Sequence, residues 1–506
     1  MPRPGLAAAC TAILLVVAAA PAQARPRATT VRTPQGTITT TPRPGGAMHL
    51  KMRFGPVRIN PGQNTIAIAP NGLRPPTEGW ITSFKPNLTY VDGRVPRVDI
   101  IHLHHAVWLV SSAAGALRPT WAAGEEKTVV RMPKGFGWRL RASDQWHLNH
   151  MVHDLVPTPT RVFITWEMDF VPLGARAARG MREVQTQWMD VEGYRAYPVF
   201  DVIRGSGRKG RFTYPDDAPK AYAGRPPRNR WVVDHDATII ATAGHLHPGG
   251  LWTDLELTRN GRTVRLFRSR AKYFEPAGPV SWDVSMTATP PRWRVAIRKG
   301  DVLTVSGTYD SRRASWYESM AIMPLAITTA PAGGANPFRT NVDVRGVLTH
   351  GHLPENDTHG GAKGALRNPL RLPDGPRTGT VGISSFLYGQ GDLSAPGRRG
   401  LPAVVPPGRP LTFVNDDAGR EIFHTITACR QPCTATTGIA FPLADGPSTF
   451  DSGELGFGPA GFTAAANRKT WSTPGDLTRG TYTYFCRIHP FMRGSVRVAG
   501  GKRRRE

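Results

Sequence analysis

The chain has 506 residues, a formal net charge of +27, 54 glycines and 47 prolines. This length allows roughly two to four domains with their own hydrophobic cores, so the fold does not need disulfides to stabilise it. Although the chain is strongly basic, it has no basic helix or base-stacking motif, which argues against nucleic-acid binding. The positive charge instead predicts a solvated basic surface that attracts an anionic cell envelope.

The first residues resemble a Sec-type export signal. Arg3 precedes an apolar run over 11–20, and "PAQA" supplies small residues for cleavage after Ala24. No later stretch approaches the roughly 18 apolar residues of a membrane helix, so no membrane span is predicted. Residues 1–24 are therefore predicted to be a signal peptide, and the mature chain is expected to be secreted.

The expected export determines how the four cysteines are interpreted. Cys10 leaves with the signal, and an oxidising compartment predicts a disulfide between Cys429 and Cys433 in "ACRQPC". Two reduced thiols are the alternative. Either way Cys486 is left without a cysteine partner, and an unpaired cysteine in a secreted protein requires an explanation.

The pattern of apolar residues predicts an all-β protein. Short runs of β-branched and aromatic residues end at Gly, Pro, Asn or Asp, as in 161–170, 263–267 and 301–309. The segments 328–341 and 367–379 have the composition of linkers. We therefore expect β-sandwiches at 25–205, 206–327 and 381–500, a linker with a histidine-rich loop at 328–380, and a basic tail at 501–506.

Three H-x-H elements lie before residue 380: "HLHH" at 102–105, "GHLHPGG" at 244–250 and "THGH" at 349–352. Residues two apart on a strand face the same side, so each element can present two imidazoles to one ion. Core or surface histidines without a metal are the alternative. The pattern predicts metal sites in the first two sandwiches.

The order of these elements resembles the copper type II, ascorbate-dependent monooxygenases, which are peptidylglycine hydroxylase and dopamine β-monooxygenase. The motifs that carry the resemblance are "HLHHAVW", "NHMVHDL", "GHLHPGG" and "YESMAIM" over about 90–325. The resemblance implies two jelly-roll sandwiches with one copper each. It assigns an electron-donating copper to His104, His105 and His153, and an oxygen-activating copper to His245, His247 and Met320.

Some alternatives remain within this assignment. Adjacent histidines point to opposite faces of a regular strand, so His104 and His105 can share a metal only through a bulge. His102 with His104 is the easier pair, while His150 competes with His153, and Met323 with Met320. Outside the resemblance, three histidines of the "THGHLPENDTHGG" segment are candidates for a further metal site or for a conductive contact between the halves, and an ordered polar loop is the alternative. They are His350, His352 and His359.

A second ligand set lies near the end of the chain. Cys486, His489 and Met492 occupy the short "CRIHPFM" segment between two strand-like runs, "TYTYF" and "GSVRV", and His424 lies in a strand-like run at 411–428. A thiolate, two imidazoles and a weak thioether are the ligands of a type 1 copper centre. The alternatives are a buried cysteine beside a core methionine, and zinc, which rarely recruits methionine.

The stretches "YFCRIHPFMRG" and "HTIT" resemble amicyanin and other plastocyanin-like cupredoxins over about 381–500. The resemblance implies a Greek-key β-sandwich with His424, Cys486, His489 and Met492 as copper ligands. It also implies one-electron transfer through an exposed edge of His489. The "ACRQPC" insertion departs from small plastocyanins.

These observations predict a secreted multi-copper redox protein. The type 1 copper would exchange single electrons with an N-terminal copper pair, which would activate dioxygen to oxidise an organic substrate. A redox partner protein or a small reductant would supply the electrons. A multicopper oxidase is excluded because Phe485 and Arg487, and not histidines, flank Cys486. The alternatives are a non-catalytic electron carrier whose N-terminal sandwiches bind a partner, and copper storage or delivery.

Overall fold

The computed structural model describes most of the chain after residue 26. The described residues are 27–62, 66–70, 72–111, 115, 117–192, 199–218, 229–274, 282–312, 316–356, 367–430, 449–457, 468–489 and 491–500. The predicted signal peptide lies outside them. Within these ranges no helix is long and apolar enough to cross a membrane.

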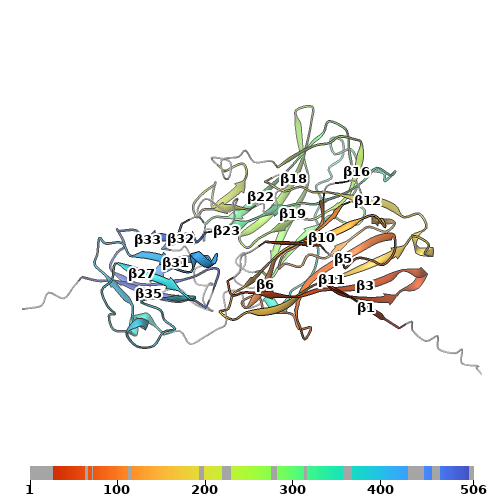
Figure 1. The fold of residues 1–506 in the computed structure, drawn as a ribbon. Helices are drawn as coiled ribbons and strands as arrows, with labels where there is room; N and C mark the ends of the chain where they lie inside the picture. Colours follow the sequence, from red (N-terminus) through yellow and green to blue (C-terminus); the bar gives the residue numbers. More distant parts are fainter. Residues whose placement is uncertain are drawn as a thin grey trace, which may run out of the picture.

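The all-β prediction is confirmed, because the described residues form strands, arranged in several sandwiched sheets, and only short 3-10 helices (Figure 1). The runs predicted at 161–170, 263–267 and 301–309 all lie within strands. The 3-10 helices are η1 (Pro44–Gly46), η2 (Arg176–Ala178), η4 (Pro354–Asn356), η5 (Pro369–Arg371), η6 (Gly397–Gly400) and η7 (Ala418–Arg420).

The largest sheet has eleven strands within the described residues and runs through both halves of the region before residue 330. The antiparallel pair β12–β25 joins the first part of the sheet to the second. In order, the strands are β1 (Thr29–Thr33), β2 (Gly36–Pro42), β3 (Met48–Ile59), β11 (Thr160–Pro172), β5 (Gly79–Tyr90), β9 (Phe136–Leu140), β12 (Arg182–Gln187), β25 (Leu325–Thr328), β16 (Ala237–Thr242) and β21 (Val295–Ile297), with β8 (Val130–Arg131) beside β5.

A sheet of four described strands packs on the first half of the large sheet. Its order is β4 (Ala67–Pro70), β10 (Gln145–Asp154), β6 (Ile101–Ser111) and β7 (Arg118–Ala123). One side of β6 and β10 contributes Leu103, Trp108 and Leu148 to the core shared with β3, β5 and β11. The other side is free to carry polar groups.

The second half of this region has a core of its own, built around Leu255, Phe267 and Val305. Its main sheet contains β14 (Arg211–Tyr214), β22 (Val302–Asp310), β18 (Gly250–Arg259), β19 (Arg262–Tyr273), β20 (Val284–Ala288) and β26 (Val347–Leu348), with β15 (Arg230–Val232) beside β22. Two short pairs complete it: β13 (Phe200–Val202) with β23 (Trp316–Ser319), and β17 (His245–Leu246) with β24 (Ala321–Ile322).

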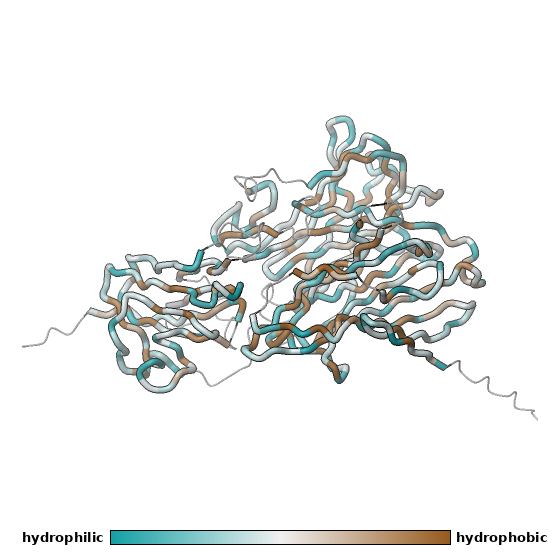
Figure 2. Tube along the Cα trace, viewed as in Figure 1, coloured by the Kyte–Doolittle hydropathy of each residue, from teal (hydrophilic) through white to brown (hydrophobic). Residues whose placement is uncertain are grey.

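The C-terminal part forms a separate sandwich of two sheets around Phe413, Tyr482 and Tyr484. One sheet contains β28 (Leu387–Tyr388), β27 (Thr380–Ser384), β30 (Thr412–Asn415) and β33 (Thr470–Ser472). The other contains β29 (Ala403–Val405), β35 (Arg493–Val498), β34 (Gly480–Phe485), β31 (His424–Arg430) and β32 (Phe450–Leu455). Figure 2 shows hydrophobic residues recurring along the strands of all three sandwiches.

The C-terminal sandwich packs against the rest of the chain, next to β23 (Figure 1). A small hydrophobic cluster joins them, in which Phe423 and Ile488 meet Met151 and Met320. In addition, the Arg487 guanidinium lies 4.7 Å from the centre of the Trp316 ring. Phe423 and Ile488 are direct neighbours of His424 and His489, so this contact brings two predicted ligands to the interface.

Candidate metal centres

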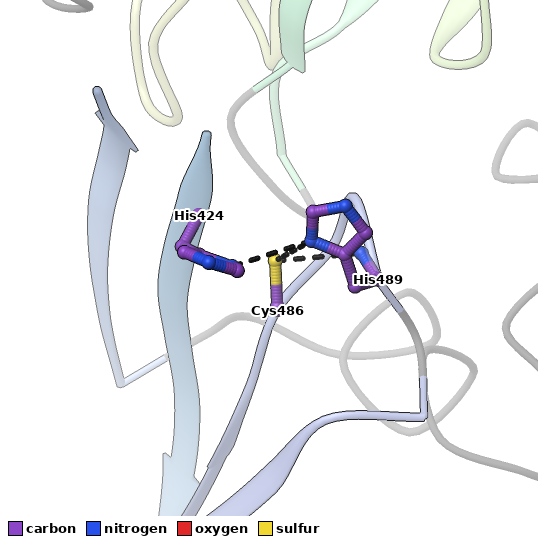
Figure 3. A group of neighbouring side chains, drawn as sticks. All are labelled: His424, Cys486 and His489. Atoms are coloured by element: carbon purple, nitrogen blue, oxygen red, sulfur yellow. Dashed lines mark hydrogen bonds between the residues drawn. The ribbon is translucent and has the colours of Figure 1, made fainter. Parts of the chain in front are cut away.

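Three predicted ligands of the C-terminal sandwich converge in one buried group. Sγ of Cys486 and one ring nitrogen each of His424 and His489 all lie within 4.8 Å of one another. The Nδ1 atoms of the two histidines are 3.3 Å apart, and Sγ lies 3.6 Å from Nδ1 of His489. Figure 3 shows the sulfur between the two imidazole rings. These donors fit a soft or borderline metal ion.

The strands explain how these side chains meet. His424 begins β31, Cys486 directly follows β34, and the two strands are antiparallel neighbours in one sheet. The turn from Cys486 to Met492 is closed by the Met492 N–H, which donates to the His489 carbonyl at 2.9 Å. Met492 is buried in the same core as Cys486, and its carbonyl accepts a hydrogen bond from the Cys486 N–H at 3.4 Å.

A buried carboxylate orients His424. Oδ2 of Asp417 lies 3.1 Å from Nε2 of His424, which leaves Nδ1 of that ring for the group. Asp417 also accepts backbone hydrogen bonds from Ser385 and Phe386. Burial alone would raise the pKa of Asp417, but its hydrogen bonds to His424 and to the backbone lower the pKa overall. Such an outer partner fixes the ring orientation of a metal-binding histidine.

The surroundings of Cys486 lower the pKa of its thiol. Burial raises its pKa, but the charge of His489 and the hydrogen bond from His424 outweigh burial, so the pKa lies well below the usual thiol value. The sulfur also accepts backbone N–H groups of Thr425 at 3.3 Å and His489 at 3.4 Å. A thiolate is the form that binds metal.

One expectation about His489 is wrong. The cupredoxin resemblance implies an exposed edge of this ring, whereas only 1% of His489 is exposed. The Phe386 ring lies 4.9 Å from it, and Ile488 packs into the cluster that contains Met151 and Met320. The physical reason is that this end of the C-terminal sandwich lies at the interface with the N-terminal half, where Ile488 packs near Met151 and Met320. The sequence of the C-terminal domain alone does not contain this contact.

A second buried group lies in the N-terminal half. His104 of β6, His153 of β10 and Glu318 of β23 each offer one ligand atom, and these atoms lie within 4.8 Å of one another. Nε2 of His104 is 3.4 Å from a Glu318 carboxylate oxygen. We call these three residues the histidine–glutamate cluster. Borderline ions such as copper and zinc take this mixture of imidazole and carboxylate.

A β-bulge shapes this part of β6. In the pairing with β10, Met151 is opposite His105 and Val152 is opposite Leu103, so His104 is the extra residue. The rings of His104 and His105 therefore come to 5.8 Å between centroids, although the residues are adjacent. The bulge that His104 and His105 would need in order to bind one metal ion together is therefore present.

Further aromatic side chains surround the histidine–glutamate cluster. The His247 ring lies 4.8 Å from the His104 ring, and the His102 ring lies 5.0 Å from the His153 ring. Both His102 and His247 are buried, and their Nε2 atoms have no hydrogen-bond partner among the residues that the structure describes. Trp282 covers them, with ring distances of 5.3 Å to His102 and 5.2 Å to His247. His247 is thus a candidate fourth ligand.

Burial keeps these imidazoles neutral. It is the largest cause of the lowered pKa values of His104, His153 and His247, and their mutual proximity lowers them further. Burial also lowers the pKa of His102 to about 4. Neutral imidazole is the form that coordinates a metal ion, so the cluster keeps its donors available near neutral pH.

The remaining residues of the two predicted copper sites lie beside the cluster. Nε2 of His105 is 3.1 Å from the Asn149 side chain, and Nδ1 of His245 is 2.8 Å from the Glu126 carboxylate. Met320 is buried, and its carbonyl accepts a hydrogen bond from Tyr309. The structure thus brings together His104, His153 and His247 from two predicted sites, and places His105, His245 and Met320 along one cavity next to them.

The alternative ligands occupy other positions. His150 packs edge-on against Phe54, with 5.9 Å between the rings, and Met323 lies in the second core. In the histidine-rich loop, His352 pairs with Asp283 and His350 contacts the carbonyl of Gly351. His359 and the side chains of the predicted Cys429–Cys433 disulfide lie outside the described residues.

The two groups are neighbours across the sandwich interface. His153 of the histidine–glutamate cluster feels the charge of His489 of the C-terminal group, which contributes to lowering the pKa of His153 after burial and the nearby histidines. The backbone of β10 also places Met151 in the hydrophobic cluster that contains Ile488. His153 and His489 are therefore close enough to interact electrostatically across the interface.

Sequence reasoning missed the acidic residues. Glu318 is two residues before the predicted Met320, has a left-handed backbone with φ of 52°, and is the carboxylate of the histidine–glutamate cluster. A non-glycine residue held at positive φ often marks a functional position. Asp417 lies 7 residues before His424, and Glu126 lies 119 residues before His245. No sequence-spacing rule identifies either carboxylate as the partner of its histidine.

Comparisons with known proteins do not assign this chain to a family. No protein-family model matches the chain, and no curated protein matches it. A purple cupredoxin from Nitrosopumilus maritimus aligns over 24% of this chain and 100% of its own length, at 19% identity and a TM-score of 0.15. A variant of oxalate decarboxylase from Bacillus subtilis aligns over 59% of this chain and 74% of its own, at 7% identity and a TM-score of 0.15. A vicilin from Corylus avellana aligns over 59% of this chain and 83% of its own length, at 7% identity and a TM-score of 0.13. Scores this low support no assignment of function.

Proposed function

We propose that this protein is a copper redox protein with two centres in one chain. A type 1 copper would be held by His424, Cys486, His489 and Met492, and a second copper by His104, His153 and Glu318. Copper would supply one-electron chemistry at both places. The observation that carries the proposal is that His489 is 1% exposed and lies close enough to His153 for its charge to lower the pKa of His153.

The residues of the C-terminal group support the first assignment. The thiol has a strongly lowered pKa, the two histidines present Nδ1 atoms 3.3 Å apart, and Asp417 holds the far nitrogen of His424. Zinc would use the thiolate and imidazoles equally well, but would gain nothing from the buried thioether of Met492.

The interface supports exchange between the centres. A carrier that reacts with external partners needs an exposed ligand edge, but His489 is buried, with the Phe386 ring against it. Its neighbour Ile488 packs into the cluster that contains Met151 and Met320 of the N-terminal half. The side of the C-terminal site that His489 forms therefore serves the histidine–glutamate cluster of the same chain. Excluding water from this contact favours fast exchange because little solvent has to reorganise.

The test is the copper content of the purified mature chain, with visible and electron paramagnetic resonance spectra of the same sample. We expect one type 1 and one type 2 signal. Cys486→Ser should remove only the first, and Glu318→Gln only the second. Copper confined to the C-terminal sandwich would overturn the two-centre proposal and favour a simple electron carrier.

A second candidate function is oxygen-dependent hydroxylation, as in the monooxygenases that the N-terminal motifs resemble. The observation that favours it is an apolar cavity of about 560 Å³ lined by His105, His245 and Met320, beside the histidine–glutamate cluster. Copper there would supply dioxygen activation for oxidising a C–H bond. Ascorbate-dependent oxygen uptake that rises with an organic substrate and is lost in Glu318→Gln would support this function, and uptake unaffected by that change would contradict it.

A further inference from the structure

The hydroxyl of Tyr309 joins two segments of the second sandwich that reach the histidine–glutamate cluster. Tyr309 lies near the end of β22, is fully buried and packs edge-on against Phe200, with 5.5 Å between the ring centres. Its hydroxyl accepts hydrogen bonds from the backbone N–H groups of His247 at 3.2 Å and Met320 at 3.1 Å, and donates one to the Met320 carbonyl. A hydroxyl can donate one hydrogen bond and accept two, so backbone groups of these two segments account for all three.

The first of these segments carries His247, which directly follows β17. Its ring hydrogen-bonds the backbone of Glu318, while its buried Nε2 has no hydrogen-bond partner within the described part of the chain. Nδ1 is therefore the atom that contacts Glu318, which leaves Nε2 to bind a metal ion. Metal-binding histidines typically donate their other ring N–H to a carbonyl or carboxylate in this way.

The second segment carries Glu318. Its backbone has φ of 52°, a left-handed conformation that a non-glycine residue keeps only where its surroundings hold it. Tyr309 holds Met320, two residues later, by both the N–H and the carbonyl of that residue. The ring of His247 holds the backbone of Glu318 itself. One hydroxyl therefore fixes both the chain that carries the carboxylate and the residue whose ring contacts it.

Both segments meet at His104 of the first sandwich. A Glu318 carboxylate oxygen lies 3.4 Å from Nε2 of His104, and the His247 ring lies 4.8 Å from the His104 ring. Packing in the core would be satisfied by a phenylalanine at position 309, so the hydroxyl is the group that requires an explanation. Its three hydrogen bonds all go to the segments that bring Glu318 and His247 to His104.

We propose that Tyr309 is a positioning residue that makes His247 the fourth ligand of the histidine–glutamate cluster. The cluster then offers three imidazoles and one carboxylate to one metal ion, a donor set that suits borderline ions such as copper, zinc and cobalt. This inference rests on the second centre of the proposed function, but not on the identity of the ion that the centre binds.

The test counts the imidazoles bound to Cu²⁺ by pulsed electron paramagnetic resonance, which detects the remote nitrogen of each coordinated ring. It uses the full-length Cys486→Ser chain, so that a type 1 copper does not contribute. We expect three imidazoles in this chain and two after His247→Gln. Adding Tyr309→Phe should also leave two, and should weaken Cu²⁺ binding by about tenfold to hundredfold, the usual effect of losing an outer partner.

The matched control is Tyr482→Phe. Tyr482 is buried in the C-terminal sandwich, and its hydroxyl donates to the Thr478 carbonyl at 2.8 Å, so this change also removes one buried hydroxyl. It should leave three imidazoles and an unchanged affinity. Equal weakening in Tyr482→Phe and Tyr309→Phe would show an effect of general stability and overturn the positioning role, and so would three imidazoles in Tyr309→Phe. Only two imidazoles before any change at His247 would overturn its role as a ligand.

A second ion separates this inference from the proposed function. If the cluster binds no Cu²⁺, the proposed function fails, but titration of the same variants with Co²⁺, followed by its visible absorption, still tests the ligand set. Co²⁺ binding that is weakened by His247→Gln and Tyr309→Phe and kept in Tyr482→Phe would support the positioning role. Absence of both ions from the cluster would overturn it. Thermal melts check that each variant is folded, and His247→Gln tests the ligand even where Tyr309→Phe does not fold.

Discussion

The two candidate metal centres differ in how the chain builds them. The C-terminal group takes Cys486, His489 and Met492 from one short turn and adds only His424 from the neighbouring strand. The histidine–glutamate cluster takes one residue each from β6, β10 and β23, and β23 lies far along the chain from the other two strands.

The difference has a physical consequence for each site. A turn between two paired strands holds its ligands at fixed spacing, so the C-terminal group depends mainly on local structure. The histidine–glutamate cluster exists only when the first and second sandwiches are packed together, because Glu318 comes from the second. Its geometry is therefore coupled to tertiary stability, and the four predictions that follow separate the two cases in order of effect.

The largest expected effect is on the C-terminal group. Cys486→Ser should abolish the intense thiolate-to-copper absorption completely and lower the bound copper by one equivalent, because a hydroxyl does not replace a soft thiolate. Visible spectra with metal analysis measure this. Met492→Leu is the matched control and should keep the absorption, since the axial ligand is weak. A Cys486→Ser protein that keeps its colour would rule out this site as the type 1 centre.

The next effect is on the histidine–glutamate cluster. Glu318→Gln should weaken copper binding there by roughly a hundredfold, since losing an outer partner alone typically costs 10- to 100-fold. Competition with a chelator, followed by the type 2 resonance signal, measures the affinity. The half-buried Glu256, which lies beside Asp254, is the control position for Glu256→Gln. Equal loss in both variants would mean that Glu318 acts through stability and not as a ligand.

A smaller effect is expected from the outer partner of His424. Asp417→Asn removes the charge that orients this ring, and should weaken copper binding at the C-terminal group by about tenfold while the absorption remains. Chelator competition at the wavelength of that absorption follows it. Asp416→Asn, one residue earlier, is the control and should be silent. An unchanged affinity in Asp417→Asn would contradict the orienting role.

The smallest effect concerns the interface. Gly62 has φ of +63°, and a Cβ atom there would come within 2.9 Å of Ile422 and Phe386 of the C-terminal sandwich. Gly62→Leu should destabilise the docked arrangement by about 1–3 kcal/mol, the usual cost of overpacking. Both copper spectra should persist, while electron exchange between the centres slows in stopped-flow measurements.

Gly93 provides the control for this change. It also has positive φ, at +91°, but no atom of the described part of the chain lies within 4 Å of an added Cβ. Gly93→Leu therefore carries backbone strain of the same kind without the clash. Exchange that slows equally in both variants would show that backbone strain, and not undocking, is the cause.

Much of the local structure could be predicted from sequence. Alternating and β-branched runs identified β11, β19 and β22, because a strand with one buried side imposes period two on its residues. The spacing of Cys486, His489 and Met492 likewise predicted a common turn. Such features depend on neighbours in sequence and survive without knowledge of the partners.

The arrangement of the N-terminal histidines could not be predicted in the same way. The motifs assigned His104 and His247 to separate sites, but their rings are 4.8 Å apart. The bulge at His104 and the packing of β6 against the second sandwich decide which imidazoles face each other. Neither depends on spacing within one motif.

By itself, the sequence determined the all-β class, the strands and the ligand turn, because hydrophobic periodicity and turn residues act over a few positions. Only the tertiary structure decided that Glu318 joins His104 and His153, that Glu126 and Asp417 orient their histidines, and that His489 is buried. Each of these depends on contacts between segments distant in sequence, which form only when the sandwiches pack.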